Sequence, residues 1–369
     1  MKILIATGIY PPSIGGPATY SKLLFDELPS RGIEVKIVSY DDVRKYPKGI
    51  SHLIYFFKVF LAGIRKDAIY AMDPVSVGFP AMIASRLLGK RFVLKIVGDY
   101  AWEQGTQLHG ISDTLDDFVK ISHDGKVGHL EKIQKRVAKE ADKIIVPSRY
   151  LKKIVSQWGV DENKITVIYN AFESSINEIT KSEAKNNLNV ESPCVISIGR
   201  LVPWKGFRAL IEIMRDLLND FPNLKLYIAG EGPDRKELSD LITKLNLEKS
   251  VSLLGALPKE KLFEYISASD LFVLNTNYEG FSHQLLEVLS LNRPIVTTSA
   301  GGNPELIVDG ESGILIEYND KKALIESIGK ILKDHDYGKK LSDEGKKVVS
   351  SFSIDRMLNE TESELKNML

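Results

Sequence analysis

The chain has 369 residues, and this length predicts two domains, since single compact cores seldom grow beyond about 250–300 residues. Hydrophobic residues make up 43% and charged residues 27%, which excludes a disordered, collagen-like or disulfide-rich chain. The single cysteine, Cys194, lies in an apolar run typical of a buried strand and excludes an intrachain disulfide. We therefore expect a protein of the reducing cytoplasm.

Charge is distributed unevenly along a chain of zero formal net charge. Residues 1–172 hold 25 of the 49 basic residues and 18 of the 49 acidic ones, so the two halves carry +7 and −7. This asymmetry favours contact of the N-terminal half with something anionic, such as a membrane surface or a phosphorylated acceptor. The alternative is a solvated basic face without a partner.

Short β-branched runs alternate with longer amphipathic segments, which predicts an α/β fold with parallel sheets covered by helices. The polar stretch 173–192 has the composition of an interdomain connection, and helical segments that end in 354–369 follow the last strand. Twelve strands are expected, six in each half: 2–6, 34–39, 68–72, 92–97, 143–146 and 166–169, then 194–199, 225–229, 251–254, 271–274, 294–298 and 313–316.

The loop after the first strand, 10–17, ends in Gly15, Gly16 and Pro17, and an amphipathic helix follows it. Pro17 suits the first helical turn, where its missing N–H costs little. Glycines let the backbone approach a ligand closely, and a helix N-terminus favours negative charge. The pattern indicates a phosphate or diphosphate site, with a purely structural turn as the alternative.

The segment 51–66 is rich in aromatic and aliphatic residues and carries basic residues near its ends. We interpret it as a buried helix that precedes the strand at Ala68, because helices of α/β folds are apolar on the side facing the sheet. The alternative is an interfacial helix on an anionic membrane. With Lys58 inside the apolar run 53–64, the segment is too short to span a bilayer, and we also expect no export signal at the N-terminus.

The first strand of the second half is followed by a similar loop, 199–206, which contains Arg200 and Lys205. Both cations belong to the carboxyl edge of the sheet, where open α/β folds bind ligands. A guanidinium fork and a mobile ammonium together can neutralise a diphosphate. Surface solvation of each residue is the alternative.

The stretch 279–287 places two carboxylates, Glu279 and Glu287, eight positions apart after a strand. With Ser282 as N-cap, Glu279 lies before the helix and Glu287 inside it, over roughly 12 Å at the helical rise. This spread suits the two ends of an extended ligand and is too wide for a carboxylate dyad. The residues at the helix start, where backbone amides favour phosphate, are Gly280, Phe281, Ser282 and His283.

These motifs, in this order, resemble the retaining GT-B glycosyltransferases of family 4 (glycosyl transferases group 1). A glutamate, seven residues and a second glutamate after such a strand is that family's signature, and the likeness runs nearly end to end. The other motifs that carry it are Gly15-Gly16, Gly199-Arg200, Lys205-Gly206, Gly230-Glu231-Gly232-Pro233, Gly301-Gly302, Pro304-Glu305, Gly310 and Gly313.

The resemblance implies two Rossmann-like domains facing each other across a cleft: an acceptor-side domain of residues 1–172, onto which the helix 352–369 packs back, and a donor-binding domain of residues 173–351. It implies that Arg200 and Lys205 bind the donor diphosphate, Glu279 holds hydroxyls of the transferred sugar, and Glu287 holds the ribose. The amide of Gly16 is expected against the phosphate.

The chain departs from the family pattern after the strand 92–97, where many relatives have a histidine and this chain has Asp99. We expect Asp99 to bind sugar or to act as acid or base, with Trp102 and Glu103 as acceptor-side neighbours. The alternative is that Asp99 caps the following helix. The expected catalytic residues are thus Glu279, Asp99, Arg200 and Lys205.

The resemblance predicts a retaining hexosyltransferase with a UDP- or GDP-linked sugar as donor and a glycan, glycolipid or lipid-linked oligosaccharide as acceptor. We expect no metal, since the histidines and acidic pairs lack ligand spacing, and we also expect no cofactor and no nucleic acid partner. The expected location is the cytoplasm, with peripheral contact to the inner membrane face through the basic half. The alternatives are a nucleotide-sugar epimerase or hydrolase, and a catalytically silent sugar-nucleotide-binding protein.

Overall fold

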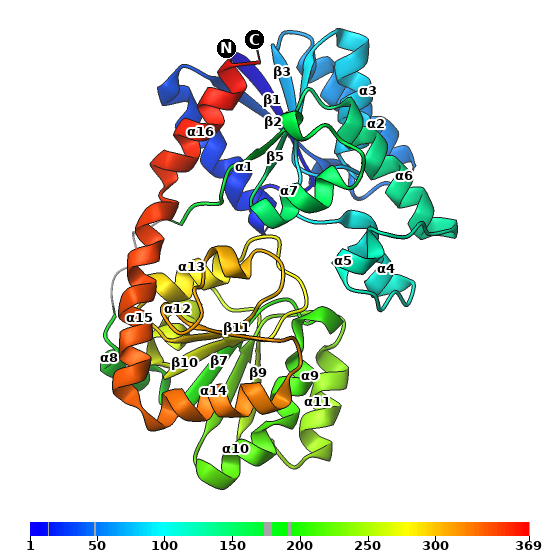
Figure 1. Ribbon diagram of the computed structural model, residues 1–369. Helices are drawn as coiled ribbons and strands as arrows, with labels where there is room; N and C mark the ends of the chain where they lie inside the picture. The colour runs from blue at the N-terminus through cyan, green and yellow to red at the C-terminus, as the bar shows by residue number, and fades with distance from the viewer. Residues whose placement is uncertain (14, 48, 173–178, 191–192, 369) are drawn as a thin grey trace. The chain divides into compact units, whose positions relative to one another are not determined.

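The structure is a computed structural model, and it describes residues 1–13, 15–47, 49–172, 179–190 and 193–368 (Figure 1). Contacts between residues divide the chain into two compact units. Unit 1 comprises Met1–Asn170 with Ile354–Leu369, and unit 2 comprises Ala171–Ser353. The sequence predicts domain boundaries at 172/173 and 351/352, and these boundaries stay a prediction.

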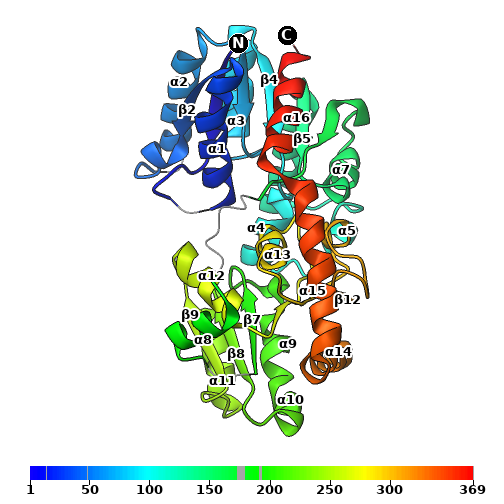
Figure 2. The ribbon, with the colours of Figure 1, turned by 90° about the vertical axis from the view of Figure 1, so that its left-hand side faces the viewer.

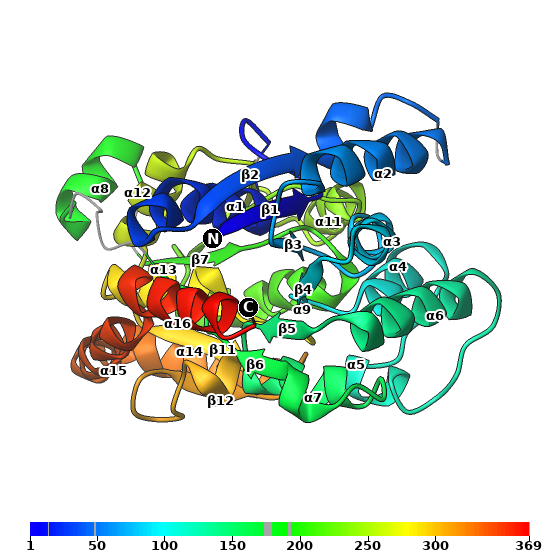
Figure 3. The ribbon, with the colours of Figure 1, turned by 90° about the horizontal axis from the view of Figure 1, so that it is seen from above.

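Unit 1 contains a six-stranded parallel sheet in the order β2-β1-β3-β4-β5-β6. Helices α1 and α16 lie on one side of the sheet, and α2, α3 and α6 lie on the other (Figure 3). The strands are β1 (Lys2–Thr7), β2 (Glu34–Ser39), β3 (Ala68–Ala71), β4 (Arg91–Lys95), β5 (Lys143–Val146) and β6 (Ile165–Val167). The helices are α1 (Gly16–Glu27), α2 (Ile50–Gly63), α3 (Gly78–Leu88), α4 (Tyr100–Leu108), α5 (Leu115–Phe118), α6 (Gly125–Glu140), α7 (Arg149–Ser156) and α16 (Ile354–Lys366).

Unit 2 contains a second six-stranded parallel sheet, in the order β12-β11-β10-β7-β8-β9. Side chains of α9, α10, α11 and α14 share one hydrophobic core with its strands. The strands are β7 (Cys194–Ile198), β8 (Lys225–Ala229), β9 (Val251–Gly255), β10 (Leu271–Leu274), β11 (Ile295–Thr298) and β12 (Ile314–Ile316). The helices are α8 (Lys181–Leu188), α9 (Phe207–Glu212), α10 (Met214–Asp220), α11 (Arg235–Lys244), α12 (Lys259–Ala268), α13 (His283–Ser290), α14 (Lys321–Lys333) and α15 (His335–Val349).

The expected α/β fold class is confirmed, and each of the twelve expected strands is present within two residues of its expected bounds. The two sheets differ in strand order, however. Counted from β7, unit 2 has the order 3-2-1-4-5-6 of dinucleotide-binding folds, whereas unit 1 has the order 2-1-3-4-5-6. Both orders reverse direction next to the first strand of the unit, and ligands of open α/β sheets bind at such a switch point.

The strands β3, β7, β10 and β11 are buried along their whole length because helices cover both faces of each sheet. In β10 all four residues are fully buried, and in β7 all five are buried, Cys194 among them. Each aliphatic side chain buried in this way contributes about 1.5–3 kcal/mol. These rigid strands fix the positions of the loops at their carboxyl ends.

Helix α16 belongs to unit 1 although it lies at the far end of the sequence (Figure 2). Its buried residues are Met357, Leu358, Thr361 and Leu365. Arg31 forms ion pairs with Asp355 at 3.2 Å and Glu362 at 3.3 Å, and Lys143 pairs with Glu364 at 2.8 Å. The helix is therefore attached by an apolar face and by charge pairs at both of its ends.

The stretch 173–192 is more than a connection, because residues 181–188 form α8. Thr180 and Glu183 build a capping box at its start, a Thr-x-x-Glu pattern that favours a helix. Ala184 of α8 packs against Ala268 of α12 in a small core of its own. Residues 173–178 and 191–192 of this stretch lie outside the described residues, as does Leu369.

Helix α2 buries one narrow face and exposes an apolar one. Ser51, Tyr55, Val59 and Gly63 face the interior. On the opposite side five large apolar side chains recur at helical spacing with exposed fractions of 48–65%, and we call this set the α2 stripe: Ile50, Leu53, Phe57, Leu61 and Ile64. The expectation that this helix is apolar because it is buried is therefore wrong for its outer face.

In the part of the chain that the structure describes, no helix is long and apolar enough to span a bilayer.

Candidate functional site

The loops that follow β7 and β10 meet at the switch point of unit 2, because these two strands are neighbours in the sheet. Thr276 donates a hydrogen bond from Oγ1 to the carbonyl of Trp204 at 3.2 Å, and the amide of Asn277 donates to the same carbonyl at 2.7 Å. The two loops that carry the expected site residues are thus joined by direct hydrogen bonds.

Lys205 and Glu279 form an ion pair between Nζ and Oε1 at this point. Lys205 ends a single 3-10 turn, Pro203–Lys205, and Glu279 lies between β10 and α13. Their side chains are only 11% and 13% exposed, so the pair is largely withdrawn from water and its attraction is stronger than that of a surface pair. The structure therefore brings together two of the four expected catalytic residues.

Glycines at two positions make this geometry possible. Gly206 has φ +56°, and a Cβ there would lie 2.4 Å from Asn275 atoms. Gly301 has φ +60°, and a Cβ there would lie 2.1 Å from the carbonyl oxygen of Glu279, whose position is fixed by a 2.8 Å hydrogen bond from the amide of Gly302. Other residues would be strained at both positions, and their side chains would push the loops apart.

Arg200 is exposed and stands two residues beyond the end of β7, next to the buried Gly199. Arg200 thus lies at the carboxyl end of β7, in the same loop as Lys205. This is the edge of the sheet where both residues were expected. The joint action of Arg200 and Lys205 on one ligand stays a prediction.

Helix α13 begins as expected, with Ser282 as N-cap accepting a hydrogen bond from the amide of Leu285 at 3.3 Å. Gly280, Phe281 and Ser282 are buried, and His283 is exposed at the first helical position. Phe281 packs against Phe352 with ring centroids 5.5 Å apart. The helix start is therefore held in place by the contact of Phe281 with Phe352, and His283 is the exposed residue at this point.

Glu287 lies in the second turn of α13 and is partly buried. Burial raises the pKa of Glu287 to about 7, and the charge of Lys259 opposes this only in part. Holding a poorly solvated carboxyl group at this position costs free energy. A pKa perturbed in this way is typical of residues that bind ligands.

In unit 1 the loop before α1 has Gly15 as N-cap with φ +155°, and Pro17 stands in the first turn as expected. A Cβ at Gly15 would lie 2.7 Å from Ile9, whereas a Cβ at Gly16 would meet no atom within 4 Å. The space beside Gly16 is therefore open, as close approach of a ligand requires. Ile14, which is part of this loop, lies outside the described residues.

A cavity of about 330 Å³ lies in unit 1 at the carboxyl edge of its sheet, between the loops that follow β1, β3 and β4. Gly8, Asp73, Gly98, Tyr100 and Glu103 are among the residues that line it. It is thus at the switch point of this sheet, next to the start of α4. Glu103 was expected in such a pocket, and Asp73 was not.

Asp73 follows β3 and holds the turn that leads into α3. Its Oδ1 accepts hydrogen bonds from the amides of Val75, Ser76 and Val77 at 2.8, 2.6 and 3.3 Å. Burial raises the pKa of Asp73, and these amides oppose the rise. None of the described residues donates to its Oδ2, so this oxygen is available to a ligand. The signal in the sequence was a carboxylate directly after a buried strand.

Asp99 is the N-cap of α4, which is the alternative that the sequence left open. Its Oδ1 accepts hydrogen bonds from the amide of Trp102 and from Nε2 of Gln134, both at 2.9 Å. The side chain is 1% exposed, burial raises its pKa, and its Oδ2 has no partner among the described residues. Its neighbours Gly98 and Tyr100 line the cavity. The geometry favours a structural role, and the catalytic role stays a prediction.

Across the residues that the structure describes, no three His, Cys, Asp or Glu side chains are grouped so that they could hold a metal ion.

Two family models match the chain in succession. The model described as "Glycosyltransferase Family 4" matches residues 14–175, and that described as "Glycosyl transferases group 1" matches residues 178–348. An uncharacterized glycosyltransferase of Methanocaldococcus jannaschii is 28% identical over 375 residues, 96% of this chain and 95% of the relative. The 4-alpha-N-acetylgalactosaminyltransferase of Campylobacter jejuni that is named for a diphospho-undecaprenol substrate is 30% identical over 58% of this chain and 57% of the relative.

Solved structures are similar over the whole chain. Anabaena Alr3699/HepE in complex with UDP-glucose has a TM-score of 0.79 at 21% identity, with both chains fully covered. Sucrose-phosphate synthase from Thermosynechococcus elongatus has a TM-score of 0.82 at 18% identity and covers 100% of this chain and 99% of the other. At these identities the likeness establishes the fold.

Proposed function

Because the chain belongs to the family 4 glycosyltransferases and transfers a sugar from a nucleotide-sugar donor, we propose that it is a retaining, metal-independent hexosyltransferase that acts on lipid-linked acceptors at a membrane surface. The donor is proposed to be UDP-linked. UDP-glucose is the molecule in the complex of the similar Anabaena protein. The name of the Campylobacter relative includes a diphospho-undecaprenol, and that of the Rhizobium relative includes lipopolysaccharide core biosynthesis.

The observation that carries the donor site is the Lys205–Glu279 ion pair at the switch point of unit 2. In the proposal, Lys205 turns its ammonium to the departing diphosphate and Arg200 adds its guanidinium, while Glu279 accepts hydroxyls of the sugar. Neutralising the leaving group and fixing the sugar supply most of the acceleration. Before the donor binds, the two opposite charges compensate each other in a site that is largely withdrawn from water.

The ribose is proposed to bind at Glu287, and the diphosphate to lie at the amides of Gly280, Phe281, Ser282 and His283, where α13 begins. Gly15 and Gly16 are proposed as phosphate-binding backbone at the start of α1. The open space beside Gly16 supports this role.

The acceptor is proposed to bind in the cavity of unit 1, with the free Oδ2 of Asp73 and the side chain of Glu103 as acceptors for its hydroxyls. A volume of about 330 Å³ suits a single sugar ring and is at the lower end of small-molecule sites. Asp73 lies in the loop after β3 and Glu103 in the first turn of α4, so together they can orient a diol.

Membrane contact is proposed to occur through the α2 stripe. Its five apolar side chains are exposed on one face, and the exposed Lys58 and Arg65 belong to the same segment, Lys58 in an ion pair with Asp42 at 3.1 Å. An apolar face flanked by cations binds the headgroup region of anionic bilayers. The excess of positive charge in residues 1–172 acts in the same direction.

The test is product analysis with UDP-glucose and UDP-N-acetylglucosamine, with and without a polyprenyl-linked sugar in anionic vesicles. We expect UDP release that depends on the acceptor, and an anomeric proton coupling in the product that reports the configuration of the donor. A matched control is Glu279→Gln, which keeps shape and removes charge and should lower turnover by about 100-fold.

An inverted product would contradict retention. Release of UDP and free sugar that does not depend on any acceptor would favour a hydrolase, and conversion of one UDP-sugar into another would favour an epimerase.

A further inference from the structure

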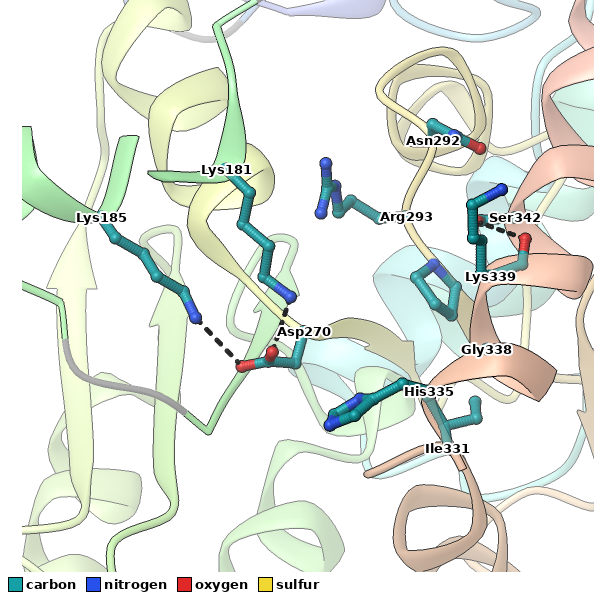
Figure 4. Close-up of a pocket in the computed structure, with 11 residues that line it drawn as sticks. Lys181, Lys185, Asp270, Asn292, Arg293, Ile331, His335, Gly338, Lys339 and Ser342 are labelled. Atoms are coloured by element: carbon teal, nitrogen blue, oxygen red, sulfur yellow. Dashed lines mark hydrogen bonds and ion pairs between the residues drawn. The ribbon is translucent and has the colours of Figure 1, made fainter. Parts of the chain in front are cut away.

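A cavity of about 540 Å³ lies in unit 2 at the edge of the sheet opposite the donor loops (Figure 4). Asp270 and Pro294, which line it, directly precede β10 and β11, whereas the donor loops follow the carboxyl ends of β7 and β10. The four residues of β10 span roughly 13 Å at the rise of a strand. The cavity is therefore separate from the Lys205–Glu279 pair.

The charge of its lining is strongly positive. Lys181, Lys185, Arg293 and Lys339 line it together with the single carboxylate Asp270. Asp270 is only 9% exposed and already pairs with Lys181 at 2.6 Å and Lys185 at 3.8 Å, and it also accepts a 2.7 Å hydrogen bond from the amide of Cys194. One buried carboxylate thus faces two lysines, and it leaves an excess of positive charge in the cavity.

Arg293 is the central cation of this cavity. Figure 4 shows its guanidinium in the space between Lys181 and Asn292. Its Nε donates to the carbonyl of Leu291 at 3.2 Å, and the described part of the chain provides no carboxylate within ion-pair distance of it. Burial lowers the pKa of Arg293, and the charge of Asp270 compensates in part. Partial burial costs this guanidinium part of its hydration free energy, which an anionic ligand would recover.

Polar groups around the cations can complete an anion site. Lys339 is 72% exposed and pairs with Asp343 at 2.5 Å at the rim, from which it can swing to a ligand. His335 and Gly338, in the first turn of α15, also line the cavity, while the N-terminus of this helix is capped by Asp334, which accepts a hydrogen bond from the amide of Tyr337 at 2.9 Å. The volume exceeds that of phosphate alone and suits a small phosphorylated molecule.

We propose that this cavity binds a phosphate monoester of the size of a sugar phosphate, with its phosphate on Arg293 and the lysines. The doubly negative phosphate matches the charge excess better than a carboxylate does, and the guanidinium fork fits its oxygens in a bidentate manner. The cavity is connected to the donor site by α13, which carries Glu287 and ends three residues before Arg293. A ligand bound in this cavity is thus positioned to influence the donor site.

Calorimetric titration of the full chain with glucose 6-phosphate tests this, with glucose and inorganic phosphate as comparison ligands at matched ionic strength. We expect glucose 6-phosphate to bind, phosphate to bind more weakly, and glucose not to bind. Arg293→Gln should weaken glucose 6-phosphate by at least about tenfold. Arg215→Gln, which changes an exposed arginine of α10 in the same unit, and Arg200→Gln at the donor edge should leave it unchanged.

Lys339→Gln is the second variant. Because the side chain of Lys339 is exposed, this substitution should not disturb folding, and it should weaken glucose 6-phosphate binding by a smaller factor than Arg293→Gln does. Vesicles that contain phosphatidic acid are tested on wild type and Arg293→Gln, and only vesicle binding that Arg293→Gln lowers would identify a lipid headgroup as the source of the phosphate. The proposal is overturned if wild-type protein binds neither glucose 6-phosphate nor inorganic phosphate and Arg293→Gln binds these vesicles as wild type does. It is equally overturned if Arg200→Gln abolishes binding and Arg293→Gln does not.

Discussion

The Lys205–Glu279 pair is the most informative contact at the scale of single residues, because it joins two oppositely charged groups in a site that is nearly closed to water. Such a pair contributes little to stability compared with apolar side chains, but removing one partner leaves an uncompensated charge. The presence of this pair is therefore better explained by function than by folding.

A double-mutant cycle separates these two roles. Lys205→Met and Glu279→Met should each lower the free energy of unfolding by about 2–4 kcal/mol, and the double variant should recover most of the loss. Turnover should stay low in all three, since transfer needs both charges. Urea unfolding and UDP release measure the two quantities. Recovery of turnover in the double variant would show that the pair is only structural.

Glu287 predicts a pH dependence of stability. Its pKa is about 7 in the folded chain against an ordinary value of 4.5, so the folded state binds the proton more tightly and stability falls as the pH rises from 4.5 to 7. Glu287→Gln should therefore be more stable than wild type at about pH 8, by up to roughly 3 kcal/mol, and nearly equal to it at about pH 4, below the ordinary pKa of the group. Urea unfolding at both pH values checks this. An equal difference at both would place the cause elsewhere.

Asp73 and Asp99 make opposite predictions under the same substitution. Asp73→Asn changes the free oxygen that faces the cavity and should lower turnover by about 10- to 100-fold, the cost of a hydrogen bond to a charged group. Asp99→Asn keeps an acceptor for the amide of Trp102 and should change turnover by less than about threefold. Steady-state rates with a soluble acceptor decide between them. A large loss in Asp99→Asn alone would restore the catalytic role expected from the sequence.

Sequence motifs located the residues of unit 2 more reliably than those of unit 1. Glycine turns, a serine cap and a lysine at a loop end are local features, and Ser282, Gly206 and Lys205 are where these features predict. Asp99 and Asp73 both follow strands, so the local pattern is the same. Which of these two carboxylates faces the cavity depends on how α3 and α4 begin. That in turn depends on tertiary contacts, such as the hydrogen bond from Gln134 of α6 to Asp99.

At the scale of elements, alternating patterns predicted the strands but not their order. The chain has the same run of strands and helices in both halves, yet the third strand of unit 1 pairs with β1 while the third strand of unit 2 lies at an edge. The difference arises from which face each connecting helix covers, and this is a tertiary property. Helix α8 was missed although its capping box was visible, because its few apolar residues resemble a linker.

Helix α2 makes a prediction at this scale. Leu61 of the α2 stripe and Leu108 at the end of α4 are 65% and 68% exposed, so they form a matched pair. Leu61→Ser should weaken binding to anionic vesicles by about tenfold, the cost of withdrawing one leucine from the headgroup region. Leu108→Ser should have an effect below about twofold. Co-sedimentation with vesicles measures both, and equal effects would remove α2 as the membrane contact.

At the scale of the whole molecule, the two α/β units have opposite net charge and carry different candidate sites. The basic N-terminal half carries the exposed α2 stripe and the cavity with Asp73, and the acidic half carries the Lys205–Glu279 pair. Membership of the family, established over residues 14–348 by two successive models, supplies the reaction class. Donor, acceptor and stereochemistry are then proposals about particular side chains.

The central claim is that Lys205 at the switch point of unit 2 binds the diphosphate of the donor. Calorimetric titration with UDP tests it most directly, because UDP carries the diphosphate without the sugar that Glu279 is proposed to hold. UDP should bind the wild type and bind the charge-neutral Lys205→Met/Glu279→Met variant about 10- to 100-fold more weakly. Equal affinity for UDP in the two proteins would contradict the account.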